Sequence, residues 1–489
     1  MANQTALTPS FSTCTYERHR PQETLLYALI EEHYPRFLDR LEAEGTSPPS
    51  FVKAEFDAYL KCGLLEHGFL RVKCNACQHE LLVAFSCKRR GFCPSCGARR
   101  MVETAAHLVD HVLPEQPIRQ WVISFPFPLR FLFATRPEVL TQVLGVVYRA
   151  ISTFITRRAG FRVGSGACTG AVTLIQRFGS ALNLNIHLHM LVLDGVYTFD
   201  HERPRFHRIK APTQCELQRL LHTIARRVTG ALERQGLLIR DIEQPYLDLE
   251  AADGFEGQAY LQLLGDAVHY RIATGPHAGG KALTLRTVPP ATTDDKPSTA
   301  HEAGFSIDAG TVCQEHERGK LQRLCRDVAR PPVSNERLSV NGHSQVVYKL
   351  KHPFRNGTTH VVMDPLAFIA RLAALVPRPR VNLTRYHGVF APNFKHRKLI
   401  VLRHQPSPRR DPHNPLAPLT WMQRLKRVFN IDIETCPHCG GTLRVIASIE
   451  DPTVIETILA HIALRDRVSD AQPRAPPPAF DDNDAVHLF

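Results

Sequence analysis

Residues 182–195 read LNLNIHLHMLVLDG, and apolar and polar side chains alternate through most of the segment with the period of two that a β-strand imposes. One face of this strand would hold the apolar residues Leu182, Leu184, Ile186, Leu188, Met190 and Val192. The other face would hold Asn183, Asn185, His187 and His189. Two imidazoles on alternate residues of a strand project side by side, as two ligands of one metal ion must. The alternative interpretation is a half-buried edge strand whose histidines only face solvent.

The flanking sequence predicts further strands and helices around this segment. Residues 120–125 and 172–178 have the apolar, β-branched character of strands. Apolar residues recur at helical spacing from Thr135 to Ile155 and again over residues 214–235. The strand at 172–178 and the histidine strand are joined by a short link, so they should run antiparallel. We therefore expect an α+β fold, an antiparallel sheet flanked by helices, with the helices on one face.

Length and composition indicate a globular protein with a basic surface. The chain has 489 residues, of which 43% are hydrophobic and 22% charged, and this length predicts about two to four domains. Its net charge of +13 suits a polyanionic partner such as nucleic acid, although a basic excess can also serve only solubility. We find neither an apolar run of about 18 residues nor a basic-then-apolar N-terminal segment, which predicts a cytoplasmic protein without a membrane partner.

The spacing of the cysteines is the strongest local signal in the chain. Cys74 and Cys77 form one C-x2-C pair, Cys93 and Cys96 form another, and fifteen residues separate the two pairs. This spacing matches a tetrahedral zinc site in which four thiolates leave no position for water. We therefore predict a structural Zn²⁺ bound by Cys74, Cys77, Cys93 and Cys96.

Other cysteines are candidates for further metal sites. Cys62, His67 and Cys87 lie in or just before the same module and could bind a second ion, but buried thiols are the simpler interpretation. Near the C-terminus, Cys436 and Cys439 form a single C-x2-C pair. Such a pair is half a zinc site and needs ligands from elsewhere in the chain.

Two basic stretches predict contact with nucleic acid, one around residues 88–100 and one at residues 378–388. The first also carries Phe92, which would suit a stacked base beside bound phosphates, although a solvated loop would look the same. The predicted DNA-binding residues are Lys88, Arg89, Arg90, Arg99, Arg100 and Arg385. Residues 275–281 match a phosphate-binding loop by chance only, because Ala282 stands where that loop needs Ser or Thr, so we expect no nucleotide cofactor.

The order of these motifs resembles one known family. The chain is similar to the rolling-circle transposases of the ninety-one family of insertion sequences and their common-region relatives, within the HUH endonucleases. The resemblance runs from the cysteine module through His187-Leu188-His189 and the stretch from Leu375 to Asn393 to Cys436-Pro437-His438-Cys439. It implies an N-terminal zinc-binding module and an HUH endonuclease-like, RRM-like nuclease domain.

The resemblance also implies a reaction, in which single-stranded DNA is nicked and joined through a phosphotyrosine. A divalent ion, Mg²⁺ or Mn²⁺, held by two histidines and a third polar group, polarises the scissile phosphate while a tyrosine attacks it. The substrate would be single-stranded or melted transposon ends on the bacterial nucleoid. His187 and His189 are the implied ligands, and Gln176 and Asp327 are candidates for the third.

On this basis the chain divides into six expected segments. They are a helical lead-in at 1–60, a zinc-binding DNA-recognition module at 61–115, a nuclease domain at 116–400 with a linker near 288–303, a Pro/Arg linker at 401–418, a small C-terminal unit at 419–465, and a disordered tail at 466–489.

One departure from the family affects the nucleophile. Relatives carry the tyrosine in a helix that reads roughly C-R-Y-hydrophobe-A-R-P, whereas residues 325–331 here read CRDVARP. Asp327 therefore occupies the expected tyrosine position, and Arg323 occupies the position of a second tyrosine. A helix-surface ion pair between Arg323 and Asp327 is the plain interpretation of these two residues. Tyr386 and Tyr348 are the candidate substitutes for the nucleophile.

Two main hypotheses follow. The first is an active transposase that nicks and joins single-stranded DNA. The second is a protein that binds transposon ends while its nuclease centre is inactive, because Asp327 replaces the tyrosine. A zinc-ribbon regulator is less favoured since it does not need the histidine strand, and a hydrolase that uses metal-bound water would need paired carboxylates, which are not near the histidines in sequence.

Overall fold

The computed structural model describes residues 14–15, 20–200, 203–239, 246–247, 258–273, 278–289, 297–401, 431–432 and 434–470. The chain divides into a larger unit, Met1–Lys61 with Ser86–Glu434, and a smaller unit, Cys62–Phe85 with Thr435–Phe489. Almost all of the expected linker at 401–418, residues 419–430 of the expected C-terminal unit and the tail beyond residue 470 lie outside the described residues.

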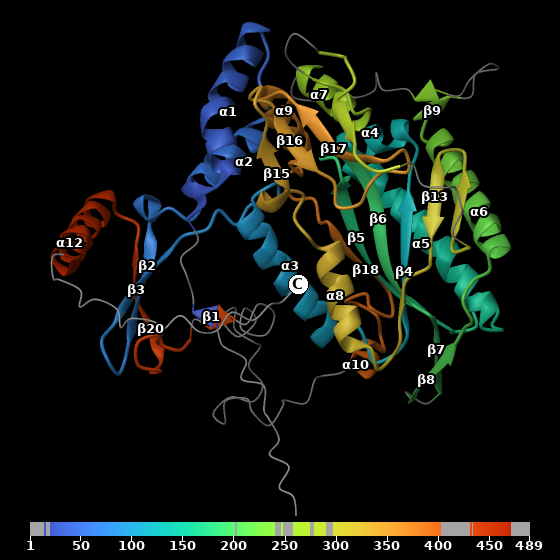
Figure 1. Ribbon diagram of the computed structural model, residues 1–489. Helices are drawn as coiled ribbons and strands as arrows, with labels where there is room; N and C mark the ends of the chain where they lie inside the picture. Colours follow the sequence, from blue (N-terminus) through green and yellow to red (C-terminus); the bar gives the residue numbers. More distant parts are fainter. Residues whose placement is uncertain are drawn as a thin grey trace, which may run out of the picture. The chain divides into compact units, whose positions relative to one another are not determined.

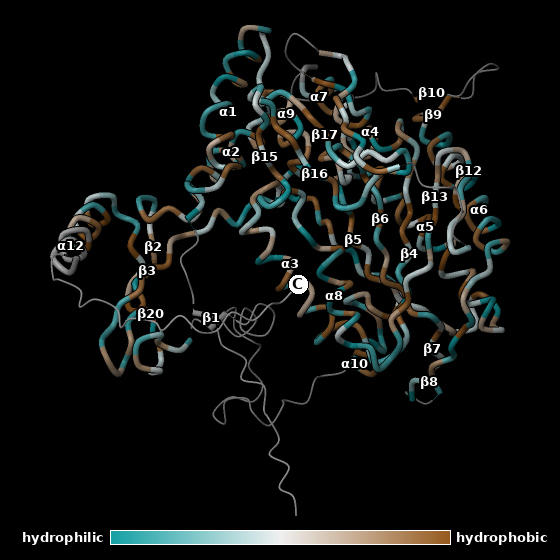
Figure 2. Tube along the Cα trace, viewed as in Figure 1, coloured by the Kyte–Doolittle hydropathy of each residue, from teal (hydrophilic) through white to brown (hydrophobic). Residues whose placement is uncertain are grey.

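An antiparallel sheet forms the centre of the larger unit (Figure 1). Its strand order is β12-β13-β4-β6-β5-β18, and β14 also pairs with β4. The strands are β4 (Ile118–Ser124), β5 (Gly170–Phe178), β6 (Leu184–Leu193), β12 (Thr299–Glu302), β13 (Phe305–Asp308), β14 (Val312–Cys313) and β18 (Thr384–Gly388). The predicted α+β fold and the antiparallel pairing of β5 with the histidine strand β6 are therefore confirmed. Hydrophobic residues gather along β4, β5 and β6 (Figure 2).

Helices cover both faces of this sheet, and not one face as expected (Figure 1). On one face, Trp121 of β4 makes an edge-to-face contact with Phe154 of α5 (Pro137–Arg158). On the other face, α3 (Pro94–His111) and α8 (Arg318–Val328) share a buried apolar cluster with Leu191 and Leu193. The reason is that β6 becomes apolar on both faces after His189, so its second half has to be covered twice.

The boundaries of α6 (Gln214–Glu233) follow from signals in its sequence. Thr213 and Glu216 form a capping box at its start, in which each side chain accepts a hydrogen bond from the backbone of the other residue. Gly236 has a φ of 68°, the left-handed conformation that favours glycine after a helix. Helix α5 is long and apolar enough to cross a membrane by length and composition alone, but more than half of its apolar window is buried, as in a core helix.

The larger unit contains further elements around the sheet. Among the described residues, its other α-helices are α1 (Leu25–Ala43), α2 (Ser50–Leu60), α4 (Phe127–Thr135), α7 (Gln258–Val268), α9 (Pro365–Leu375) and α10 (Arg397–Ile400). A second antiparallel sheet has the order β11 (Leu283–Arg286), β17 (Thr358–Met363), β16 (Val346–Lys349), β15 (Leu338–Val340). Short pairs are β7 (Gly195–Asp200) with β8 (Arg203–Arg208), β9 (Leu238–Ile239) with β10 (Tyr246–Leu247), and β1 (Cys14–Thr15) with β19 (Ile431–Asp432). The expected linker near 288–303 contains strand β12, and its residues 290–296 are not described.

The smaller unit joins two distant parts of the chain. Its antiparallel sheet has the order β20 (Leu443–Ile449), β2 (Phe69–Cys74), β3 (Glu80–Ala84), and α12 (Pro452–Asp470) follows β20. The expected boundaries, a module at 61–115 and a separate unit at 419–465, differ from this arrangement. The cause is the pairing of β2 with β20, which sequence spacing does not reveal.

Candidate functional site

Two histidines and a glutamine meet on one face of the central sheet. His187 and His189 project from the same side of β6, and Gln176 of β5 lies directly opposite His187 in the strand register. The Nε2 atoms of the two histidines are 3.1 Å apart, and Oε1 of Gln176 lies 3.2 Å from Nε2 of His189. Three atoms that can bind a metal ion therefore converge, and the third belongs to a residue that the sequence named as a candidate.

Contacts behind the histidines orient their rings. Nδ1 of His187 lies 2.8 Å from the carbonyl oxygen of Asn185, which can only accept, so Nδ1 carries the proton and Nε2 keeps its lone pair. The side-chain amide of Gln120, on β4, lies 2.8 Å from Nδ1 of His189. Gln120 was missed as a site residue because its role depends on the pairing of β4 with β6, which places it beside His189.

The electrostatic surroundings keep both histidines neutral. Burial lowers the pKa of His187 to about 4, and the charges of Arg130 and Arg330 act in the same direction. Burial also lowers the pKa of His189 to about 3, and the charges of His187 and Arg330 act in the same direction. A neutral imidazole is the form that binds a metal ion, so the pair is in its binding form at neutral pH.

Asp327, the residue at the expected tyrosine position, lies near the end of α8. Its negative charge raises the pKa of His189, so the two side chains are close enough to interact electrostatically. Lys351 donates a hydrogen bond to its carboxylate, and Arg330 lies 3.6 Å away. Burial opposes ionisation, but the hydrogen bond and charge of Lys351 and the charge of Arg330 outweigh it, so the pKa of Asp327 is lowered. These partners replace the expected ion pair with Arg323.

The two substitute tyrosines are engaged elsewhere. Tyr348 is fully buried, and its hydroxyl donates to the carbonyl oxygen of Pro332 at 3.2 Å. Tyr386 lies on β18, two strands from β6, and packs against the apolar cluster shared by α3 and α8. Burial raises the pKa of Tyr386, which lowers the fraction of its side chain present as the nucleophilic phenolate. Neither contact directs a phenol at the histidines.

A cavity of about 290 Å³ opens beside Gln176 and is lined by arginines. They are Arg89, Arg90, Arg100, Arg177 and Arg330, and its lining contains no carboxylate among the described residues. The buried Nε atoms of Arg177 and Arg330 have no hydrogen-bond partner within the described structure. Burial lowers the pKa of Arg177, and the charges of Arg378 and Arg90 lower it further. This crowding of positive charge would be relieved by a bound anion.

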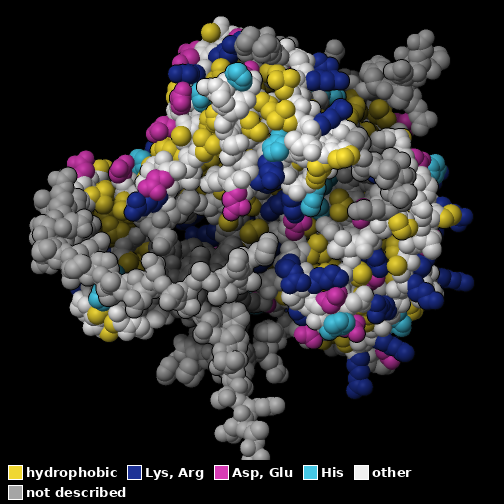
Figure 3. Space-filling view, viewed as in Figure 1, with side chains coloured by type: hydrophobic (Ala, Val, Ile, Leu, Met, Phe, Trp, Pro, Cys, Tyr) yellow, Lys and Arg dark blue, Asp and Glu magenta, His cyan; other side chains and the backbone are white. Residues whose placement is uncertain are grey.

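The other predicted DNA-binding residues lie outside this lining. Arg99 pairs with Glu103 at 3.1 Å, and the carbonyl oxygen of Lys88 accepts a hydrogen bond from Arg100 at 3.1 Å. Arg385 lies on the edge strand β18 and donates to Thr141 at 3.4 Å. Figure 3 shows Lys and Arg side chains also gathered over α8 on the surface of the larger unit.

The structure groups the cysteines into two clusters of four, whereas the sequence predicted that Cys74, Cys77, Cys93 and Cys96 form one site. Cys74 and Cys77 lie with Cys436 and Cys439, and all four Sγ atoms are within 4.8 Å of one another. Because β2 pairs with β20, the nearest partners of the first C-x2-C pair come from the C-terminal segment and not from the next pair in sequence.

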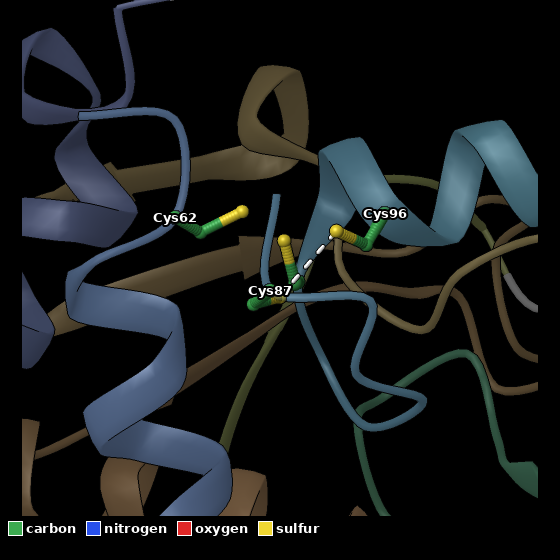
Figure 4. Close-up of side chains that lie close together, drawn as sticks. Cys62, Cys87 and Cys96 are labelled. Carbon is green, nitrogen blue, oxygen red and sulfur yellow. Dashed lines mark hydrogen bonds between the residues drawn. The ribbon is translucent and has the colours of Figure 1, made fainter. Parts of the chain in front are cut away.

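The second pair, Cys93 and Cys96, begins α3 and forms a different cluster. The Sγ atoms of Cys62, Cys87, Cys93 and Cys96 also lie within 4.8 Å of one another, and those of Cys87 and Cys96 are 3.4 Å apart (Figure 4). Cys62 follows directly on Lys61, where the chain leaves the larger unit. Cys62 and Cys87 thus lie with Cys93 and Cys96, and His67 is not part of this cluster; whether the four bind a second ion or are packed thiols stays a prediction.

Two family models match the chain. The transposase zinc-binding domain model Zn_Tnp_IS91 matches residues 29–125, which include Cys62 to Cys96. The transposase model Y2_Tnp matches residues 170–398, which include the histidine strand and α8. Searches of curated proteins and of solved structures found no match. The chain therefore carries a transposase zinc-binding domain followed by a transposase domain, which matches the organisation of an IS91-family transposase.

Proposed function

We propose that this transposase binds single-stranded or melted transposon ends and nicks and joins them at a Mg²⁺ or Mn²⁺ ion held by His187, His189 and Gln176. The convergence of their two Nε2 atoms and one Oε1 atom, at separations of 3.1 and 3.2 Å, carries the proposal. Two cis ligands of an octahedral ion, each about 2.1 Å from it, lie about 3.0 Å apart, so the donor set fits such an ion. When bound, the ion would supply Lewis-acid polarisation of the scissile phosphate.

The arginine-lined cavity supports a DNA substrate beside this site. Its lining and the proposed metal-binding set share Gln176, so a phosphate in the cavity would lie beside one of the proposed metal ligands. The unpaired Nε groups of Arg177 and Arg330 can donate to phosphate oxygens. A single strand can bring its backbone into such a cavity, whereas a duplex would have to melt first.

Asp327 favours a second candidate function, binding of transposon ends without a phosphotyrosine. In the tyrosine reaction, the phenol oxygen bonds to phosphorus while the bond from phosphorus to the 3′ oxygen breaks, and the 3′ oxygen leaves as a hydroxyl. A carboxylate in the same role would form an acyl phosphate, which water hydrolyses readily, so the strand could not be rejoined. Lys351 and Arg330 also engage the carboxylate of Asp327.

Covalent trapping distinguishes the two candidates. Full-length protein is incubated with a labelled single-stranded oligonucleotide library and Mn²⁺, and adducts that survive denaturation are counted for the wild type and for Asp327→Tyr, each with and without His187→Ala. Because the charge of Asp327 acts on the imidazole of His189, a side chain at position 327 lies near the histidines, and we expect Asp327→Tyr to form an adduct that His187→Ala abolishes, while the wild type binds DNA and forms little or none.

Each outcome of the trapping experiment bears on one of the two candidate functions. No adduct with Asp327→Tyr, in protein that still binds Mn²⁺ and DNA, would contradict a nicking site at the histidines. An adduct of the wild type that maps to Tyr386 or Tyr348 would instead show that another tyrosine has taken over the role, and that this chain is an active transposase.

A further inference from the structure

The two turns that carry cysteines in the smaller unit are held together by backbone pairing. β2 and β20 run antiparallel, and Cys74 at the end of β2 lies opposite Leu443 at the start of β20. The N–H of Asn75 donates to the carbonyl oxygen of Thr442 at 3.1 Å, which continues the pairing into both turns. Two C-x2-C turns that lie 359 residues apart or more in the chain thus face each other.

We propose that Cys74, Cys77, Cys436 and Cys439 bind one Zn²⁺ that fastens the C-terminal segment to the N-terminal hairpin. The Sγ atoms of Cys74 and Cys439 are 3.5 Å apart, and those of Cys77 and Cys436 are 3.6 Å apart. Thiolates about 2.3 Å from a tetrahedral zinc ion lie about 3.8 Å from one another. Disulfide sulfurs would lie about 2.05 Å apart, so the spacing is that of ligands to a shared ion.

The two turns leave space around the sulfur atoms, and their backbone N–H groups donate hydrogen bonds to them. The N–H of Ala76 donates to Sγ of Cys74, and the N–H of Gly441 donates to Sγ of Cys439, each at 3.4 Å. A Cβ atom at Gly441 would lie 2.9 Å from Cβ of Ala76 and 3.0 Å from Sγ of Cys74. Glycine therefore leaves room for the thiolates to approach one another, which an ordinary apolar turn would not require.

The packing of the smaller unit gives the ion a structural role. Around the turns, the buried residues Val72, Cys74, Cys436 and Leu443 form a cluster against which Leu70, Leu81 and Val83 pack, and Phe69 and Ile455 are buried elsewhere in the described part of the unit, so two of the four buried cluster members are proposed ligands. A core of this size does not hold a sheet by itself, and small units commonly gain the missing free energy from a bound metal. Cys436 and Cys439 lie outside both regions that match family models. The inference does not depend on the proposed nuclease function.

Alkylation of the wild type is the first test, because no variant has to fold. Cys77, Cys439 and Cys215 are all exposed, and Cys215 on α6 belongs to neither cluster. Full-length protein is treated briefly with iodoacetamide, with and without prior removal of zinc by a chelator, and modified peptides are identified by mass spectrometry. We expect Cys215 to react in both samples, and Cys77 and Cys439 to react only after chelation. Equal reaction of all three before chelation would overturn the proposal.

Metal content of full-length variants is the second test. We expect Cys436→Ser combined with Cys439→Ser to hold one fewer zinc ion per chain than the wild type, measured by elemental mass spectrometry. Cys215→Ser is the matched control and should retain the wild-type content. Cys439→His, which keeps a zinc ligand, should also retain it. An unchanged zinc content in the double variant would refute the site.

Discussion

The side-chain amide of Gln120 lies 2.8 Å from Nδ1 of His189 and positions that imidazole. The amide Nε2 of Gln120 is the atom that faces Nδ1; when the amide turns its oxygen to the ring, that oxygen accepts a hydrogen bond from Nδ1–H and leaves Nε2 of His189 free for the metal ion. We expect Gln120→Leu to weaken Mn²⁺ binding by about 10- to 100-fold, measured by calorimetry. Gln120→Glu keeps an acceptor and should restore most of the affinity. Gln142→Leu, at an exposed position of α5, should bind like the wild type.

Single residues were predicted from sequence where their neighbours in the chain decide their position. Alternation within one strand placed His187 and His189 on one face, and the neighbouring strand supplied Gln176 as a candidate. The family pattern identified Asp327 as the residue at the tyrosine position. How close it lies to the histidines depends on how α8 packs against the sheet, so only the structure shows its charge partners. Arg177 and Arg330 were missed because their role depends on the burial of their Nε atoms.

At the scale of elements, local patterns predicted most of the central sheet and failed where pairing is distant. The apolar periodicity of α5 and α6 and the antiparallel pairing of β5 with β6 are set by residues close in sequence. Residues 378–388 were interpreted as a nucleic-acid surface, but Thr384–Gly388 forms the edge strand β18, where polar side chains are tolerated because one side of the strand is unpaired. Cysteine spacing identified candidate ligands but not which pairs lie together.

Helix α2 carries a buried carboxyl whose charge costs stability. Glu55 accepts a hydrogen bond from the N–H of Gly91 at 2.6 Å. Burial raises the pKa of Glu55, although this hydrogen bond and nearby arginines oppose the shift. Its contribution to stability is therefore greatest below the pKa of the unfolded state and is lost as the pH rises through the folded-state pKa.

We expect Glu55→Gln, which is always neutral, to raise the melting temperature at pH 8, with the gain shrinking as the pH falls toward about 4.5. Thermal melts across this range measure the difference. Glu42→Gln, at an exposed position of α1, is the matched control and should show little gain at any of these pH values. A gain for Glu55→Gln that does not change with pH would contradict a cost from ionisation.

For the whole molecule, we expect the net charge of +13 to act on DNA through particular arginines. Arg89 is exposed and lines the cavity beside Gln176, so it can be replaced without removing a core contact. We expect Arg89→Gln to weaken binding of single-stranded DNA and to reduce the slope of log affinity against log salt by about 0.7, the loss of one phosphate contact. Arg219→Gln, an exposed change on α6 that removes the same charge, should leave the slope unchanged.

The pairing of β2 with β20 also has a consequence for synthesis of the protein. The ribosome makes Cys74 365 residues before Cys439, an interval of about twenty seconds to more than a minute at ordinary elongation rates. Throughout that interval, the β2 edge that later pairs with β20 lacks its partner, and Cys74 and Cys77 lack half of their proposed ligand set. An open strand edge invites pairing with other chains, so nascent or prematurely terminated copies should be the aggregation-prone form of this protein.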